Sequence, residues 1–528
     1  MSTIDNPQTI GDIIRHQGRQ RNNEIALEFE GDEMTYGALD LGSNQAANAL
    51  ASVGVGKGDR IAYLGKNSHL YFEILAGAAK LGAVMTPINW RLARPEVTYV
   101  LNDCQAKVLF VGPGFADLVK DIEKTLKHVD RIYGSEGNEG SFPSYPEWRS
   151  EFSDSDPMVD CDVGADAIQL YTSGTTGHPK GAILTHGSLF SSRMNDVDEE
   201  ELMDWQKTVP GEVALLAMPC FHISGTGYGL GLLFNSTRGV VLPEYDPTRA
   251  LELIENYNIS KIFMVPAAIQ ILLNHPRIKE VDFSNLKYIS YGASPIPLEL
   301  MKQAMDVLGC GFVQMYGMTE TSGTIVTLNP EDHVPEGSPR MRSVGTPLKD
   351  VEVKVIDETG SSVPTNTIGE IAVRSPKNMK GYWNRPEATA ETIDAEGWLR
   401  TGDAGYLDEG GYLFIQDRVK DMIISGGENV YPAEVENAIY AHPKIADVAV
   451  IGVPDQKWGE AVKACVVVKD GEKITEADVI AHAREHIAGY KCPKSVDFID
   501  ELPRNPSGKI LRKDLRAPYW KGKDRAVN

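Results

Sequence analysis

The stretch "LKYISYGASPIPLELMKQAMDVLGCGFVQMY", residues 286–316, contains a strand pattern, a helix pattern and a second strand pattern in succession. Residues 286–292 and 312–316 are short runs rich in apolar and aromatic side chains, as buried strands are. Residues 297–309 begin at a proline and end at a glycine, which favour the start and the end of a helix. Strands that alternate with helices predict an α/β fold around a mostly parallel sheet.

The same alternation extends towards the N-terminus. Residues 246–258, "DPTRALELIENYN", place Asp246 where a helix N-cap is favoured and Pro247 at the first helical position. "KIFMV" (261–265) then has the length and composition of a buried strand. The middle of the chain is therefore predicted to form a mostly parallel α/β sheet.

Past about residue 420 the pattern changes to a compact α+β unit of roughly 100 residues, a normal domain size. Its predicted elements are a helix at 432–442, strands at 448–453 and 461–468, and a helix at 476–488. This change of pattern places a domain boundary near "QDRVKD" (416–421).

Composition excludes several classes of protein. A chain of 528 residues is too long for one hydrophobic core. The net charge of −22 gives no general attraction for nucleic acid or for anionic membranes. The six cysteines contain no C-x-x-C pair, which favours a reducing compartment. Since neither a signal peptide nor a membrane-spanning run is evident, we expect a cytoplasmic protein.

"YTSGTTGHPKGAIL" (171–184) is a loop unusually dense in glycine and hydroxyl side chains. A strand at 167–171 enters it and a short strand leaves it. Successive backbone N–H groups in such a loop form an anion nest, and Lys180 adds a positive charge, so the stretch favours polyphosphate binding. It is not a Walker A loop, because Pro179 and Gly181 stand where that motif needs glycine and serine or threonine. The alternative is a surface loop.

Three further stretches carry chemistry-bearing residues. In "QMYGMTETSG" (314–323), Tyr316 offers a flat face for adenine and Glu320 a hard oxygen ligand for Mg²⁺. Asp403, in a predicted T-G-D turn, can accept hydrogen bonds from ribose hydroxyls. Lys509 follows Ser-Gly in "PRNPSGKILRKDL" (503–515). Taken singly, these residues have ordinary alternatives: a core tyrosine, a surface turn and a solvated lysine.

The four stretches, in this order, resemble the adenylate-forming superfamily of acyl-CoA synthetases, luciferases and peptide-synthetase adenylation domains. The similarity spans roughly residues 10–515 and is nearest to bacterial fatty acyl-CoA synthetases. It implies a large N-terminal domain of packed sheets over residues 1–417, a hinge at 418–420 and a small mobile C-terminal domain over residues 421–528. It also implies a two-step reaction that uses ATP, Mg²⁺ and coenzyme A. A carboxylate attacks the α-phosphate of ATP to give acyl-AMP and pyrophosphate, and the CoA thiol then displaces AMP.

The resemblance also implies roles for individual residues. Lys509 would bridge the carboxylate and the α-phosphate, Thr319 would contact that phosphate, and Glu320 with Thr176 would bind Mg²⁺. The implied nucleotide-binding residues are Thr172, Ser173, Gly174, Thr175, Thr176, Gly177, Lys180, Gly292, Ala293, Ser294, Tyr316, Gly317, Met318, Asp403, Ile415 and Arg418. Lys420 matches the hinge. The implied CoA-binding residues are Gly426, Gly427, Glu428, Arg91, Trp458, Tyr490, Lys491 and Lys494. Cys492 departs from the pattern, since some relatives have a CoA-contacting arginine there.

"CFHISGTGYGLGLLF" (220–234) aligns with the segment that lines the acyl pocket. His222, assigned to the catalytic and acyl-pocket residues, stands where amino-acid-selective relatives have aspartate, so the acid should lack an α-ammonium. Gly225 and Gly229 would leave volume for the acid, although close helix packing is an alternative. The favoured substrate is a medium- or long-chain fatty acid. An aryl acid or a steroid side-chain acid is the alternative, and the sequence does not settle the choice.

Three functions are compatible with these motifs. The first is an acyl-CoA ligase. The second is a standalone ligase that passes the adenylate to a separate carrier protein. The third, a non-catalytic nucleotide-binding protein, is disfavoured because such a protein needs neither Lys509 nor Glu320. The sequence leaves open whether the chain is a monomer or a homodimer.

Overall fold

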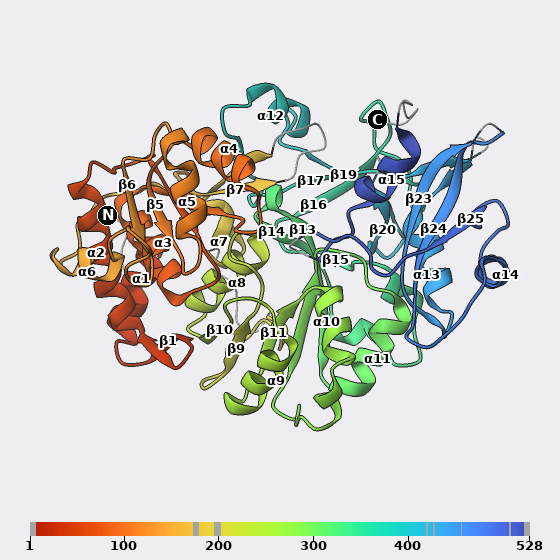
Figure 1. Cartoon of the computed structure of the whole chain (residues 1–528), viewed down its shortest axis with the longest axis horizontal. Helices are drawn as coiled ribbons and strands as arrows, with labels where there is room; N and C mark the ends of the chain where they lie inside the picture. The colour runs from red at the N-terminus through yellow and green to blue at the C-terminus, as the bar shows by residue number, and fades with distance from the viewer. Residues whose placement is uncertain are drawn as a thin grey trace.

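The computed structural model describes residues 7–172, 179–194, 202–418, 421–425, 428–455, 457–505 and 508–521 (Figure 1). The strand, helix and strand predicted first are present as β12 (Tyr288–Gly292), α11 (Leu298–Leu308) and β13 (Gly311–Met318). β12 and β13 are parallel, and Gly309 ends α11 in the left-handed conformation with φ 60°. The predicted helix at Asp246 is α9 (Pro247–Asn256), with the Asp246 side chain accepting from Arg249 N.

A nine-stranded sheet forms the centre of the molecule, in the order β15-β14-β13-β12-β11-β9-β10-β1-β2. From β1 to β13 the neighbouring strands are parallel, and the two edges are antiparallel. The mostly parallel sheet is thus confirmed. Its other strands are β1 (Ile25–Phe29), β2 (Asp32–Thr35), β9 (Val213–Leu216), β10 (Arg238–Val241), β11 (Lys261–Met264), β14 (Gly323–Leu328) and β15 (Thr346–Pro347).

A seven-stranded sheet, in the order β18-β8-β7-β4-β3-β5-β6, lies towards the N-terminal side in Figure 1. Its core is parallel, and β7, β8 and β18 form an antiparallel edge. Leu27 of the first sheet and Ile61 of the second belong to one hydrophobic cluster with Phe72, so the two sheets share a core. The strands are β3 (Arg60–Leu64), β4 (Val84–Ile88), β5 (Ala106–Val111), β6 (Arg131–Gly134), β7 (Asp166–Thr172), β8 (Lys180–Thr185) and β18 (Gly381–Tyr382).

Two smaller sheets follow along the chain. An antiparallel sheet contains β16 (Glu352–Ile356), β17 (Gly369–Arg374), β19 (Leu399–Leu407) and β20 (Leu413–Arg418). The last sheet contains β21 (Ile423–Ser425), β22 (Glu428–Val430), β23 (Ile445–Asp455), β24 (Gly459–Val468) and β25 (Ser495–Phe498). Figure 1 shows this last sheet and its helices as a small unit at one end of the molecule. The predicted fold class, a large α/β N-terminal domain with a small α+β C-terminal domain, is confirmed.

The remaining helices cover these sheets. Among the described residues, no helix is both long and apolar enough to cross a bilayer. The remaining helices are α1 (Ile10–Gln20), α2 (Tyr36–Ser52), α3 (His69–Leu81), α4 (Arg94–Cys104), α5 (Ala116–Ile122), α6 (Tyr145–Ser150), α7 (His186–Met194), α8 (Ile223–Phe234), α10 (Pro266–Leu273), α12 (Pro386–Thr392), α13 (Pro432–Tyr440), α14 (Glu476–His486) and α15 (Arg512–Trp520).

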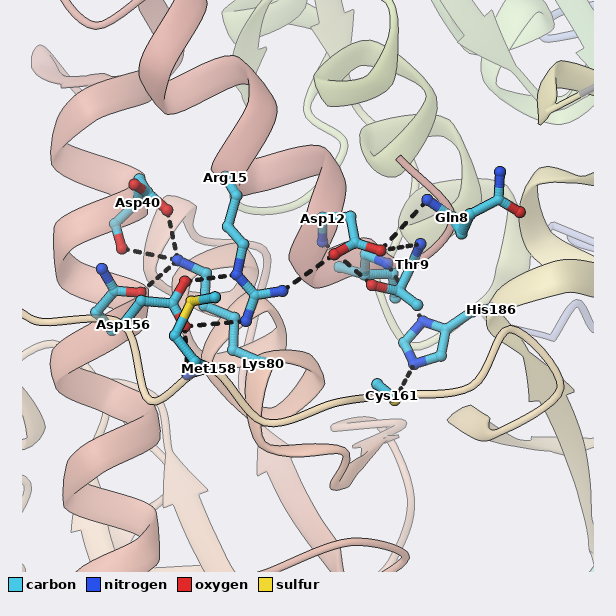
Figure 2. A network of polar contacts seen from close by, with 12 residues as sticks. Gln8, Thr9, Asp12, Arg15, Asp40, Lys80, Asp156, Met158, Cys161 and His186 are labelled. Carbon is cyan, nitrogen blue, oxygen red and sulfur yellow. Dashed lines mark hydrogen bonds and ion pairs between the residues drawn. The ribbon is translucent and has the colours of Figure 1, made fainter. Parts of the chain in front are cut away.

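A buried polar network joins the first three helices (Figure 2). Lys80 of α3 donates to Asp40 Oδ1 at 2.5 Å and to Asn44 Oδ1 at 2.6 Å. Burial lowers the pKa of Lys80, and Asp40 opposes this. Arg15 of α1 pairs with Asp156, its Nη2 lying 3.0 Å from Oδ1. Because a buried cation is costly unless it is paired, these contacts fix α3 against α2, and α1 against the loop that carries Asp156.

Candidate functional site

The carboxyl ends of β11, β12 and β13 meet at one edge of the nine-stranded sheet, since these strands are parallel. Open parallel sheets bind ligands at such an edge. A Cβ at Gly292 would lie 2.1 Å from Met315 O, so only glycine allows this approach. The structure brings the predicted adenine residues Gly292, Ala293, Ser294 and Tyr316 to this edge, and Gly317, Met318 and Thr319 follow there.

Glu320 lies in the short 3-10 helix η3 (Thr319–Thr321) and is only 6% exposed. Its Oε1 accepts from Tyr382 Oη at 2.8 Å and from Thr172 Oγ1 at 3.3 Å. Thr172 is paired with Lys180 across the β7–β8 hairpin, and Lys180 Nζ lies 5.1 Å from the centroid of the Tyr382 ring. The first stem of the predicted phosphate loop therefore contacts Glu320 directly, and Lys180 of the second stem lies beside Tyr382, which also binds Glu320. The loop residues Ser173, Gly174, Thr175, Thr176 and Gly177 lie outside the described residues.

Asp403 is linked to the same edge by Tyr316. The Tyr316 hydroxyl donates to Asp403 Oδ2 at 2.8 Å. The turn predicted at Asp403 is wrong, because strand β19 runs through this residue. Gly402 has φ +72°, which gives the strand a local bend without ending it. The backbones of Ile415 and Arg418 pair with Gly405 and Asp403, so both residues are on the neighbouring strand.

The segment that carries Lys509 comes from the C-terminal domain and reaches the same edge. A Cβ at Gly508 would lie 3.1 Å from Val265 Cγ2 and 3.3 Å from Ala267 Cβ, where β11 passes into α10. Asn505 holds the segment in shape, since its Oδ1 accepts from Lys509 N at 2.8 Å. Gln270 of α10 adds a contact between the domains, with Nε2 donating to Ala446 O at 2.7 Å.

Asp103 contacts the first stem of the phosphate loop beside Tyr99, which contacts the second stem, and the sequence analysis missed it. Its Oδ2 accepts from Tyr171 Oη at 2.6 Å and its Oδ1 from Arg385 Nη2 at 2.8 Å. Beside it, Tyr99 Oη donates to Pro179 O at 3.2 Å. Burial raises the pKa of Tyr171, so its hydroxyl stays protonated and donates. No local motif marks Asp103, because its partners are distant in sequence.

His222 is half-buried beside Phe221, with ring centroids 4.7 Å apart. Burial, helped by the charge of Arg91, lowers the pKa of His222 to about 4, so the ring is neutral at pH 7. Its Nε2 has no hydrogen-bond partner in the described part of the chain. The guanidinium of Arg91 lies 4.4 Å from the Trp90 ring centroid, and Trp90 also packs on Phe221. Arg91 is therefore near the predicted acyl segment.

Gly225 and Gly229 do not face open volume. A Cβ at Gly225 would lie 2.2 Å from Pro219 O, and one at Gly229 would lie 2.3 Å from Phe72 Cζ. At these two positions the expectation of free space for the acid is corrected, and the close-packing alternative applies. Glycine lets α8 approach its neighbours closely.

The predicted CoA residues are not all brought together. Arg91 precedes α4, whereas Tyr490, Lys491 and Lys494 follow α14, and these two helices are well apart in Figure 1. Lys491 Nζ pairs with Glu434 Oε1 at 2.7 Å. Glu428 and Trp458 are exposed residues of the C-terminal domain. Gly426, Gly427 and the hinge residue Lys420 lie outside the described residues.

Cys492 is buried in the C-terminal domain, with 1% of its surface exposed. Its Sγ lies 3.5 Å from Ala488 O, and burial raises the pKa of the thiol. A neutral buried thiol cannot supply the charge that an arginine would offer to a phosphate.

Comparison with known proteins places these features in a family. The AMP-binding enzyme family matches residues 14–383, and the AMP-binding enzyme C-terminal domain matches residues 434–509. The chain is 41% identical to the fatty acid–acyl-carrier-protein ligase ScoC of Streptomyces coeruleorubidus, over 100% of both chains. It is 39% identical to a feruloyl-CoA synthase of Amycolatopsis sp., over 97% of this chain and 99% of that one.

Comparison with solved structures supports the same family. The ATP-bound structure of MatB from Rhodopseudomonas palustris has a TM-score of 0.87 and 31% identity, covering 97% of this chain and 99% of that one. The chain belongs to the AMP-binding enzyme family, and the predicted membership of the adenylate-forming superfamily, in its acyl-CoA synthetase branch, is confirmed.

Proposed function

We propose that the protein is an AMP-forming acid–thiol ligase that activates a hydrophobic carboxylic acid with ATP and transfers the acyl group to coenzyme A. The observation that carries this proposal is the convergence of Glu320, the Tyr316–Asp403 pair and the Lys509 segment at one edge of the central sheet. Nucleotide-binding folds use this edge for ligands. The membership in the AMP-binding enzyme family supports the same reaction.

In the first step, a carboxylate oxygen of the acid bonds to the α-phosphorus of ATP, and the bond to the β-phosphate oxygen breaks. Lys180 would hold the departing phosphates, and Asp403 would accept hydrogen bonds from the ribose. Lys509 places a cation between two anions that must meet, and such preorganised groups are worth about 3–4 kcal/mol. Acyl-AMP and pyrophosphate result.

The residues around Glu320 fit a magnesium ion. Both hydroxyl donors bind Oε1, and no described residue donates to Oε2. Carboxylate oxygen is the ligand type that Mg²⁺ prefers, and the ion would offset the negative charge of the phosphates. In the second step, the CoA thiol gives its proton to water, its sulfur bonds to the acyl carbon, and AMP leaves with the electron pair of the broken carbon–oxygen bond.

The substrate class follows from the environment of His222. A neutral, half-buried imidazole offers no counter-charge for an α-ammonium, so we propose a medium- or long-chain fatty acid, with aryl and steroid side-chain acids as the alternative. A pyrophosphate-exchange screen of fatty, aryl and amino acids tests this. Stronger exchange with any α-amino acid than with octanoate, dodecanoate and the aryl acids would refute the assignment.

One observation favours a carrier protein instead of coenzyme A as the acyl acceptor: Cys492 is buried where some relatives have a CoA-contacting arginine. ScoC, a relative by sequence, is named a carrier-protein ligase. The test is AMP release from pre-formed acyl-AMP with CoA or with a phosphopantetheinylated carrier protein. Faster release with CoA supports the first proposal. Release with the carrier protein alone would replace it with the second.

A further inference from the structure

Three metal-ligating side chains gather at the C-terminal end of α14, away from the nucleotide edge. His482, Glu485 and His486 offer ligand atoms that all lie within 4.8 Å of one another. Positions i, i+3 and i+4 of a helix share one face, so the spacing H-x-x-E-H directs all three side chains to one side. His482 is half-buried, whereas Glu485 and His486 are exposed and free to adjust.

The hydrogen bonds of the two rings leave the same nitrogen available on each. His486 Nδ1 lies 2.8 Å from His482 O, so Nδ1 carries the proton and donates. The ring of His482 is hydrogen-bonded to the backbone of Ala438, and its buried Nε2 has no partner among the described residues. An imidazole held at Nδ1 by a carbonyl presents its lone pair on Nε2, as metal-binding histidines do.

A third histidine lies beside the cluster. The His442 ring lies 4.9 Å from the His482 ring, at 89° to it. Nδ1 of His442 accepts from Lys444 N at 3.2 Å, so in the neutral ring its proton is on Nε2. His442 is thus a neighbour of the cluster and not a ready ligand.

We propose that His482, Glu485 and His486 bind a divalent transition metal ion of the Zn²⁺ and Cu²⁺ class. Two imidazoles and one carboxylate suit these ions, whereas Ca²⁺ and Mg²⁺ take oxygen ligands. Zn–N bonds of about 2.0–2.1 Å put tetrahedral ligand atoms about 3.3–3.4 Å apart, so the most distant pair here must close by up to about 1.5 Å. Rotation of the two exposed side chains permits this movement, and water completes the coordination.

The position of the site gives the ion a structural effect. It would bridge the last turn of α14, from which the segment with Tyr490, Lys491 and Lys494 continues. The ion would therefore brace the helix end that carries this segment. Anything that binds only the folded chain also stabilises it.

The test is equilibrium dialysis of the tag-free, full-length protein with Zn²⁺. We expect one equivalent to bind saturably. Loss of an outer partner of a metal site already weakens binding about 10- to 100-fold, so loss of a ligand in His482→Gln, His486→Gln or Glu485→Gln should weaken it at least about tenfold. His128→Gln, which removes an exposed histidine elsewhere, is the matched control and should bind as the unaltered chain does.

Three results would overturn the proposal. Equal Zn²⁺ affinity in all variants would place the ion elsewhere. A thiolate charge-transfer band with Co²⁺ would assign the ion to a cysteine. A loss in His442→Gln as large as in His482→Gln would refute the three-ligand set, since we expect His442→Gln to stay within a few-fold. Unchanged circular dichroism and adenylation activity show that the variants fold, so a loss of binding then supports the proposed ligands.

Discussion

Asp103 holds the first stem of the phosphate loop through Tyr171 and also pairs with Arg385. Asp103→Asn keeps its size but removes the charge that faces Arg385. Hydrogen bonds to charged groups are worth about 1.5–3 kcal/mol, so we expect the KM for ATP to rise about tenfold or more, with a smaller change in kcat. Pyrophosphate exchange at varied ATP concentration measures both.

Asp121→Asn is the matched control, because Asp121 forms an exposed pair with Arg94. A double-mutant cycle of Asp103→Asn with Tyr171→Phe should show a coupling free energy of about 0.5–3 kcal/mol, as contacting residues do. Purely additive effects would mean that Asp103 does not act through Tyr171.

Lys509 is the residue expected to separate the two half-reactions. Lys509→Ala removes the cation between carboxylate and α-phosphate, so acyl-AMP formation should fall about 10²-fold or more. Conversion of synthetic acyl-AMP with CoA should stay within a few-fold of the unaltered enzyme. Single-turnover assays with labelled acid follow each step, and the exposed Lys513→Ala is the control. An equal loss in both steps would contradict the role of Lys509.

His186 links stability to pH. Its Nδ1 accepts from Ile10 N at 3.2 Å, and burial lowers its pKa to about 4. The unfolded chain, with an ordinary pKa near 6.5, then binds more protons between about pH 4 and 6.5, so stability falls as pH drops through this window. Between pH 7.5 and 5, His186 should account for about 2 kcal/mol. Urea unfolding of His186→Asn should show a correspondingly weaker pH dependence, and an unchanged dependence would refute the assignment.

At the scale of elements, α8 depends on glycine for its approach to α3. Gly229→Ala places a methyl group against Phe72, and overpacking of this kind costs about 1–3 kcal/mol. Chemical denaturation should show that loss, and Phe72→Leu in the same chain should restore part of it. Gly227→Ala is the control, since its nearest neighbour is the Ile223 side chain at 3.2 Å. A change in preferred acid length without loss of stability would instead favour the acyl-pocket interpretation of Gly229.

The helices and strands were largely predictable, because the residues that favour helix starts and ends stand where the folded chain begins and ends its helices. Pro247 and Gly309 stand where α9 begins and where α11 ends, and the alternating pattern led directly to the parallel sheet. Asp403 was misplaced because a glycine with positive φ can bend a strand as well as end one. Asp103 was missed because a hydrogen bond across 68 residues leaves no trace in local sequence.

At the scale of the whole molecule, the structure shows one arrangement of the small domain, and the proposed two-step reaction predicts a second. The Lys509 segment is at the nucleotide edge, while the predicted CoA residues are spread over both domains. Contacts near the domain boundary hold this position. Asp417 at the end of β20 accepts from Ala433 N of the small domain at 3.2 Å, and Asp421 pairs with Arg516 at 3.0 Å. Motifs predict the residues of such a site, but the relative position of two domains depends on contacts that no motif encodes.

We predict that the hinge at Lys420 permits the second arrangement. Lys420→Pro would fix φ and remove a hydrogen-bond donor. Adenylation should stay largely intact while thioester formation from pre-formed acyl-AMP slows, because hinge motion is needed only between the steps. Lys420→Ala, which leaves the backbone free, is the control. Equal loss in both half-reactions would argue against a hinge at this residue.

The seven-stranded sheet has a consequence for how the chain is made. Its outer strand β18 pairs with β8, although some two hundred residues separate them, with Tyr382 opposite Ala182. During synthesis, the ribosome releases β8 long before β18, and for that interval the edge of β8 is an unpaired template for other chains. A nascent chain that stalls before residue 382 would therefore expose the edge of β8, the strand that follows the predicted phosphate loop. Such a chain would need a chaperone more than the finished enzyme does.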